Sequence, residues 1–133
     1  MRPILDKDTG MNKTETRYSQ HLTLLSKVHP VDGGTIGCHG CDSEFERVES
    51  WRFEPMGLKL AREKCFYYPD FLVVYKDRFE FHEVKAFNRK IGRPLMKDDS
   101  LVKIKVASSE YPWFNFKIAF YNPQLGWEYR RIK

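Results

Sequence analysis

The sequence lacks the features that mark membrane and secreted proteins. Among its 133 residues there is no run of 18 apolar residues that could span a bilayer, and no apolar core of a signal peptide near the start. The three cysteines are an odd number, which fits a reducing compartment better than a disulfide framework. We therefore expect a soluble, cytoplasmic protein with no membrane partner.

No internal repeat is visible, and charge of either sign is only mildly in excess. Lys and Arg number 23 against 18 Asp and Glu, so the formal net charge is +5, which suits a polyanionic partner without requiring one. Aromatic residues are abundant, with 10 Phe, 7 Tyr and 3 Trp, and this argues strongly against a disordered chain. We expect a flexible N-terminal arm over residues 1–11 and a single folded domain over residues 12–133.

Residues 69–85 contain two apolar runs that flank a short polar break at Lys76-Asp77. If these two residues form the turn of a hairpin, Asp70 lies opposite Glu83, with Cβ atoms about 5 Å apart on one face. Lys85 is two residues beyond Glu83 and points to the same face. The sequence therefore predicts two carboxylates and an ammonium at one end of an otherwise apolar face, provided that the register does not slip.

Carboxylates this close repel one another unless a cation lies between them. Their hard oxygen atoms favour Mg²⁺ or Mn²⁺ over zinc, and such an ion polarises a phosphodiester and activates water. Lys85 would orient that water or stabilise the developing charge. The alternative is a salt bridge at a strand end, in which Lys85 neutralises Glu83 or Asp70.

A helix is expected from Asn12 to about residue 28, because Tyr18, Leu22 and Leu25 follow at helical spacings. Asn12 is its N-cap, and Glu15 lies three residues later. Glu15 has two interpretations: the capping-box partner of Asn12, or a third acidic metal ligand that reaches from the helix over the sheet.

Residues 29–46 predict a loop insertion, since His29 to Cys41 is rich in Gly, Pro and polar residues. The pair Cys38 and Cys41 has the CxxC spacing of a zinc site, but a closed site needs four ligands. A decorated surface loop is the favoured interpretation, and structural Zn²⁺ is the alternative.

Further elements follow on both sides of the hairpin. Strands are expected at 47–54, 58–61 and 114–121, and a second helix at 101–110 is capped by Asp98-Asp99-Ser100. A strand–helix–strand crossover after Lys85 would place the last strand parallel to the Glu83 strand and beside it. Residues 127–133 read as a basic-aromatic tail. The fold class is therefore α/β, a mixed β-sheet flanked by helices in the order helix, three or four strands, helix, strand.

Several basic residues are candidates for nucleic-acid contacts, with ordinary solvated surface as the alternative for each. They are Lys13, Arg89, Lys90, Arg93, Lys103 and Lys105.

The segments Tyr67-Tyr68-Pro69-Asp70-Phe71 and His82-Glu83-Val84-Lys85 resemble the signature of the PD-(D/E)xK, or restriction-endonuclease-like, nuclease superfamily. Within it, the likeness is to small phage nucleases, including junction-resolving enzymes of the endonuclease I type. The resemblance implies a restriction-endonuclease-like fold in which Asp70 and Glu83 bind metal and Val84 adds its backbone carbonyl. It also implies that Lys85 is the catalytic lysine and Glu15 a helix-borne ligand.

The function implied by this resemblance is Mg²⁺-dependent (or Mn²⁺-dependent) endonucleolytic hydrolysis of DNA, on branched substrates such as Holliday junctions, in phage DNA processing within the host cytoplasm. Junction-resolving relatives act as dimers, so a homodimer is expected by analogy. The alternatives are a restriction-like, transposase-associated or end-processing nuclease, and a non-catalytic nucleic-acid-binding module. A zinc-binding interaction protein is a further option.

Overall fold

The structure is a computed structural model that describes residues 10–27, 30–31, 35–36, 46–61, 65–94 and 98–132. The chain divides into two compact units, residues 1–51 with 73–78 and residues 52–72 with 79–133. Residues 1–9 of the expected arm lie outside the described residues, and Met11 at its end is buried. Neither helix of the described chain is long and apolar enough to cross a membrane.

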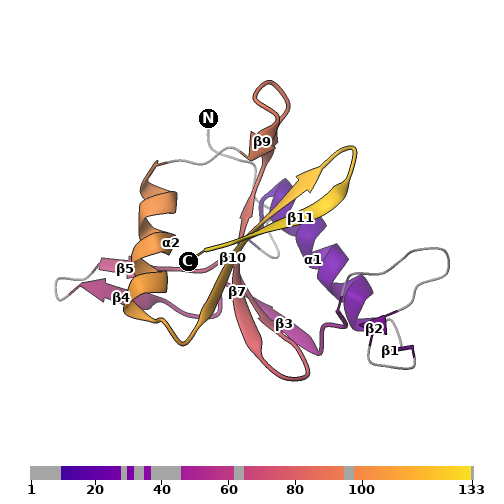
Figure 1. Ribbon diagram of the computed structural model, residues 1–133, viewed down its shortest axis with the longest axis horizontal. Coiled ribbons are helices and arrows are strands. Elements are labelled where there is room, and N and C mark those ends of the chain that lie inside the picture. The colour runs from indigo at the N-terminus through magenta and orange to yellow at the C-terminus, as the bar shows by residue number, and fades with distance from the viewer. Residues whose placement is uncertain are drawn as a thin grey trace. The chain divides into compact units, whose positions relative to one another are not determined.

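The protein is an α/β structure built on a mixed five-stranded sheet (Figure 1). The strand order is β11 (Gly126–Arg131), β10 (Asn115–Asn122), β7 (Phe79–Lys85), β6 (Phe71–Val74) and β3 (Ser50–Phe53). Strand β10 runs parallel to β7 and antiparallel to β11. Helix α2 (Asp98–Glu110) lies between β7 and β10 in the chain. The expected parallel crossover beside the Glu83 strand is therefore confirmed.

The second unit has one apolar core on one face of the sheet. It combines inward residues of β7 and β10 with α2 and with a two-stranded hairpin, β4 (Leu58–Ala61) and β5 (Cys65–Tyr67). The buried members are Leu58, Tyr67, Phe81, Ile104, Ala107, Phe116, Ile118 and Phe120. Because β-strand side chains alternate between faces, Glu83 and Lys85 lie on the same face of β7 as Phe81.

Helix α2 and the C-terminal end differ from the expectation. Helix α2 begins at Asp98, so Asp98-Asp99-Ser100 form its first turn rather than a cap before it. The described carboxylate of Asp99 is favourable there, because a negative charge in a first turn interacts well with the helix dipole. The expected basic-aromatic tail is strand β11, whose Trp127 is buried and pairs with Tyr121. Gly126, at φ 86°, follows the tight turn that leads the chain from β10 into β11.

The basic stretch after Lys85 forms a small hairpin rather than a simple loop. Strand β8 (Phe87–Asn88) pairs with β9 (Arg93–Pro94), and Gly92 at φ 66° lies in the turn between them. The Asn88 side chain accepts hydrogen bonds from the amides of Lys90 and Ile91, which fixes this turn.

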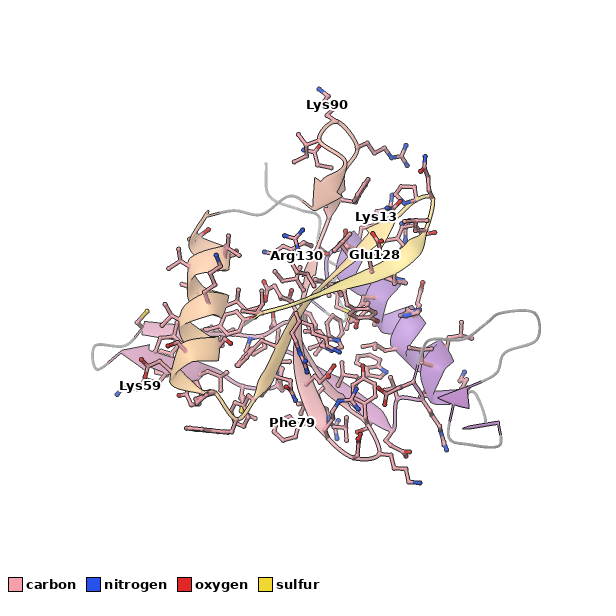
Figure 2. All side chains as sticks on the ribbon, viewed as in Figure 1. Lys13, Lys59, Phe79, Lys90, Glu128 and Arg130 are labelled. Carbon is pink, nitrogen blue, oxygen red and sulfur yellow. The ribbon has the colours of Figure 1, made fainter. Side chains whose placement is uncertain are left out.

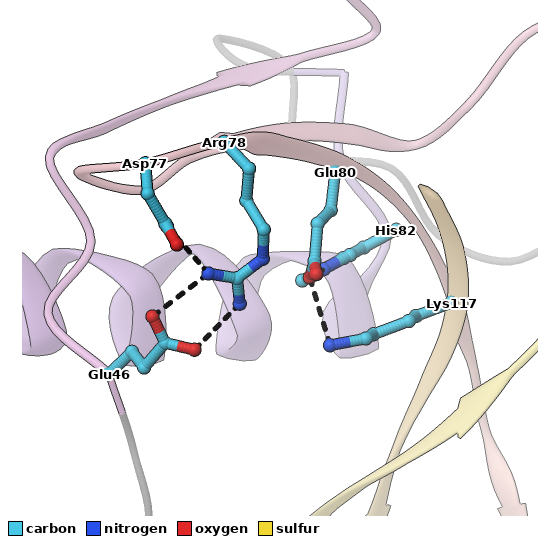
Figure 3. Close-up of polar contacts among 6 residues, drawn as sticks. All are labelled: Glu46, Asp77, Arg78, Glu80, His82 and Lys117. Carbon is cyan, nitrogen blue, oxygen red and sulfur yellow. Dashed lines mark hydrogen bonds and ion pairs between the residues drawn. The ribbon is translucent and has the colours of Figure 1, made fainter. Parts of the chain in front are cut away.

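In the first unit, helix α1 (Lys13–Lys27) confirms the predicted helix, and it buries Tyr18, Leu22 and Leu25. The turn at Lys76-Asp77 is also confirmed, since the Tyr75 amide donates to the Arg78 carbonyl at 2.7 Å. The Arg78 guanidinium forms two hydrogen bonds with Glu46, at 2.6 and 3.0 Å, and one with Asp77 (Figure 3).

The predicted loop insertion at 29–46 contains two paired strands, β1 (Pro30–Val31) and β2 (Thr35–Ile36). This short ladder differs from the loop expected there, whereas residues 29, 32–34 and 37–45 lie outside the described residues, so the insertion as a whole stays a prediction. His29, Cys38 and Cys41, which bear on the zinc alternative, lie outside the described residues.

Candidate functional site

Four polar side chains of the second unit meet near the carboxyl end of β7. Tyr67 ends β5, Asp70 directly precedes β6, and Glu83 and Lys85 belong to β7. The Tyr67 hydroxyl donates to Glu83 Oε2 at 2.6 Å, and Lys85 Nζ lies 3.3 Å from Glu83 Oε1. Asp70 Oδ2 accepts a 2.8 Å hydrogen bond from the Val84 amide. The structure therefore brings together the Asp, Glu and Lys predicted from the hairpin register, and adds a tyrosine.

Of the two site carboxylates, Glu83 is less exposed to solvent than Asp70. It is buried, and its neighbour across the ladder is Ile118 of β10, which is fully buried. A buried carboxylate needs hydrogen-bond donors or a cation to offset its lost hydration. Tyr67 and Lys85 supply one of each, one to each oxygen.

Tyr67 is a permanent donor in this site. Burial raises the pKa of its phenol, and the charge of Glu83, the hydrogen bond to Glu83 and the charge of Asp70 raise it further. The hydroxyl is therefore protonated throughout the physiological range. It fixes the rotamer of Glu83 and leaves the orientation of this carboxylate little freedom.

Asp70 is held by backbone on two sides. Its side chain accepts from Val84, and its carbonyl accepts from the Glu54 amide at 2.8 Å. Glu54 has φ 45°, an uncommon conformation for a residue other than glycine, and it turns the chain from β3 towards β4. The side-chain bond to Val84 places Asp70 beside the Glu83-Val84 segment, as the predicted register requires.

The donor set suits a hard divalent ion. Mg²⁺ in enzymes is commonly held by one or two carboxylates and completes its shell with water and substrate phosphate oxygens, so Asp70 and Glu83 fit its preference. Within the described part of the chain, no group of three or more His, Cys, Asp or Glu side chains is placed to hold a metal ion. The Lys85–Glu83 contact is also the ion pair expected from the simpler salt-bridge interpretation.

The chain was compared with protein-family models, with curated protein sequences and with solved structures. None of them matches. The assignment of function therefore depends on the residues and their geometry.

Glu15 forms the capping box that one of its two interpretations predicts. Its amide donates to Asn12 Oδ1 at 2.8 Å, and its Oε1 accepts from the Asn12 amide at 2.9 Å. The side chain is buried. Glu15 belongs to the first unit, whereas Asp70, Glu83 and Lys85 belong to the second, so its role as a metal ligand stays a prediction.

The predicted nucleic-acid contacts are dispersed over several elements. Lys103 and Lys105 are exposed on α2, Lys13 is exposed at the start of α1, and Arg89 and Lys90 are exposed in the β8–β9 turn. Figure 2 shows Lys90 directed away from this turn. The Arg93 backbone belongs to β9, but its side chain lies outside the described residues.

Sequence reasoning missed a further cation on the face that carries the site. Arg130 of β11 pairs with Ile118 of β10, which in turn pairs with Glu83 of β7. Directly paired residues share a face, so exposed Arg130 lies in one row with Glu83, two strand spacings or about 10 Å away. Arg130 is labelled in Figure 2. The only available signal was the cluster of basic residues near the C-terminus.

The opposite face of β7 carries a second polar cluster, also missed. His82 Nε2 lies 2.9 Å and Lys117 Nζ 3.1 Å from Glu80 Oε1 (Figure 3). Burial raises the pKa of Glu80, but the hydrogen bonds and charges of His82 and Lys117 outweigh it and lower that pKa to about 2. His82 and Glu80 are essentially inaccessible, whereas the Lys117 side chain is 23% exposed. The carboxylate of this cluster is therefore enclosed away from ligand.

Proposed function

We propose that the protein is a Mg²⁺-dependent endonuclease that hydrolyses DNA phosphodiester bonds. The observation that supports this most directly is the meeting of Asp70, Glu83 and Lys85 at the end of β7, with Glu83 fixed by Tyr67. Two anchored carboxylates beside an ammonium are a costly arrangement at the edge of an apolar core. A divalent ion and a phosphate group would satisfy both kinds of charge at once.

In this mechanism Asp70 and Glu83 would hold the ion, and the Val84 carbonyl would be a further ligand. The ion, when bound, polarises the phosphodiester and lowers the pKa of water. Lys85 Nζ lies 3.3 Å from Glu83, so Lys85 could reach a phosphate held beside that carboxylate. Its positive charge would stabilise the anionic transition state. Tyr67 keeps Glu83 oriented, so that little reorganisation is needed when substrate binds.

The restriction-endonuclease-like fold is part of the same proposal. It is supported by the order of the elements: a helix with Glu15 in its first turn, a hairpin that bears Asp70 and Glu83, then a helix and a parallel strand. Membership of the PD-(D/E)xK superfamily would give Glu15 its role as a third acidic ligand. Mn²⁺ would substitute for Mg²⁺ because both prefer oxygen ligands.

Branched or otherwise structured DNA is the proposed substrate, in phage DNA processing, with a homodimer as the active form. These details depend on the resemblance to small junction-resolving nucleases. The exposed cations add physical support for a polyanionic ligand, since Arg130 shares a face with Glu83 and Lys85.

The test is cleavage of labelled duplex, nicked, flapped and four-way DNA with Mg²⁺, Mn²⁺ or EDTA. We expect metal-dependent cleavage that Asp70→Asn, Glu83→Gln and Lys85→Ala each reduce by at least 100-fold, about 2.7 kcal/mol of transition-state stabilisation. Glu110→Gln and Lys76→Ala are matched controls, because both residues are exposed and outside the site. Full activity in Glu83→Gln or Lys85→Ala would exclude this mechanism.

One observation favours a second candidate, a non-catalytic DNA-binding module. Lys85 Nζ lies 3.3 Å from Glu83 Oε1, which is the contact that a structural salt bridge would make. In that case Mg²⁺ would neither stabilise the protein nor promote cleavage, while DNA binding would persist. Thermal unfolding with and without Mg²⁺ separates the two, since an ion that binds only the folded state raises its stability.

A further inference from the structure

The outward face of the β4–β5 hairpin carries aromatic side chains and a cation. Leu58 and Tyr67 are paired and buried in the core, so their neighbours Lys59 and Phe66, also a pair, lie on the opposite face. Tyr68 follows by alternation on this outward side, and its ring lies 6.1 Å from that of Phe66. Lys59 is exposed, and Tyr68 is 63% exposed.

The Tyr68 ring lies against the backbone of Gly57. A Cβ at Gly57 would lie 2.6 Å from Cε1 of Tyr68 and 3.1 Å from its Cζ, so the ring occupies the space that any other residue would need there. The register of the hairpin, continued by one pair beyond Leu58 and Tyr67, sets Gly57 opposite Tyr68. The ring therefore lies against the backbone at Gly57, while Tyr68 as a whole is 63% exposed.

This ring is close to the candidate metal site along the chain. Tyr67, immediately before it, donates to Glu83, and Asp70, two residues after it, accepts from Val84. Two residues span at most about 7 Å between Cα atoms. Pro69 between them is buried and its ring restricts the backbone, so Tyr68 and Asp70 stay close along the chain.

We propose that Tyr68 is a base-stacking site for an unpaired nucleotide next to the phosphodiester that is cut. This inference rests on the proposed nuclease function and narrows it to substrates with a single-stranded segment, such as a flap, gap or branch point. Proteins that bind single strands combine aromatic rings, on which bases stack, with cations that follow the phosphates. Tyr68 supplies the ring, Phe66 extends the aromatic surface, and Lys59 supplies the cation.

A structural role for Tyr68 predicts different behaviour. An aromatic ring that lies across a glycine on a neighbouring strand can simply stabilise a hairpin. In that role Tyr68→Ala would lower stability, but it would not change how the protein responds to the presence or absence of a base in its ligand. The experiment must therefore compare ligands as well as variants.

The experiment measures affinity for a flapped duplex whose single-stranded arm carries either normal nucleotides or one abasic site, moved along the arm. All variants carry Glu83→Gln, and binding is measured without divalent ion at fixed ionic strength. We expect the parent to lose roughly 5- to 150-fold in affinity at one abasic position, the change that corresponds to one stacked base. Tyr68→Ala should bind the normal and abasic ligands equally, whereas Tyr68→Phe should behave as the parent does.

Gly57→Ala provides an independent variant, since its methyl group displaces the ring without removing it. It should weaken the abasic effect while the ring is still present. The proposal fails if the parent is indifferent to every abasic position, or if Tyr68→Ala retains the abasic penalty. Cleavage by the parent sequence, with Glu83 intact, is assayed separately. An abasic effect without metal-dependent cleavage would uphold base stacking and refute the nuclease, and the reverse result would refute base stacking alone.

Discussion

Replacing Tyr67 by phenylalanine tests whether the candidate site is preorganised. The substitution keeps the buried ring, whose centroid lies 6.3 Å from that of Phe116, and removes the hydroxyl that donates to Glu83 at 2.6 Å. A hydrogen bond to a charged group contributes about 1.5–3 kcal/mol. We therefore expect Tyr67→Phe to lower the free energy of unfolding by about 2 kcal/mol at pH 8, measured by urea titration.

The pH dependence gives this prediction its second part. The pKa of Tyr67 is raised in the folded protein, so the stability that its hydroxyl contributes to the folded state is fully present below pH 10, the usual pKa of a phenol. Above pH 10 the unfolded chain loses this proton while the folded protein keeps it, so stability falls by about 1.4 kcal/mol per pH unit. Tyr67→Phe lacks this component. The curves for parent and variant should therefore converge near pH 11.5, an estimate of about 2 kcal/mol divided by that slope.

Tyr68→Phe is the matched control, since Tyr68 is 63% exposed. It should follow the parent at every pH. A constant difference between Tyr67→Phe and the parent from pH 8 to pH 11.5 would show that the hydroxyl is not buried against a charged Glu83, and the reasoning would be wrong. A lower apparent Mg²⁺ affinity in Tyr67→Phe would connect this bond to ion binding.

Two further predictions concern stability. The pKa of Glu80 is lowered to about 2 from an ordinary value of 4.5, so the stability contributed by its ionised form is present above pH 4.5 and lost as the pH falls towards 2. Glu80→Gln should therefore lower the free energy of unfolding by about 3 kcal/mol at pH 7 and by much less at pH 2.5, measured by urea titration. An equal loss at both pH values would contradict the buried ion pair. Gly126→Ala places a side chain at φ 86° and should lower the free energy of unfolding by about 1 kcal/mol, measured by thermal unfolding. The control is Leu125→Ala in the same turn, which truncates a residue that is 72% exposed and should leave the stability nearly unchanged. Equal effects of the two substitutions would rule out backbone strain as the cause.

The features that sequence predicted well depend on neighbours in the chain. Helix α1 is marked by Asn12 and Glu15 at its start and by apolar residues at helical spacing, and the hairpin turn is marked by two polar residues between apolar runs. Both signals are local, so one sequence suffices. The parallel pairing of β7 with β10 followed from the handedness and geometry of a crossover through α2.

The features that were missed depend on partners distant in sequence. Tyr67 reads as an ordinary apolar strand residue, because the carboxylate that it contacts is 16 residues away. Strand β11 mixes charged and aromatic residues without clear alternation, and its pairing with β10 decides its structure. In the same way, Glu80 and His82 alternate with Phe79 and Phe81, but their cation, Lys117, comes from β10.

The hydrogen bond from the Val84 amide to Asp70 has a consequence for observing the site in solution. A backbone amide bound to a side-chain carboxylate is released when that side chain moves away, and its bond is weakened when the carboxylate is protonated, even if the surrounding sheet stays closed. Isotope exchange at this one amide would therefore follow Asp70, while exchange at its neighbours in β7 follows opening of the sheet. Strand β7 thus contains a built-in probe of Asp70 on the neighbouring segment, readable without substrate, product or turnover.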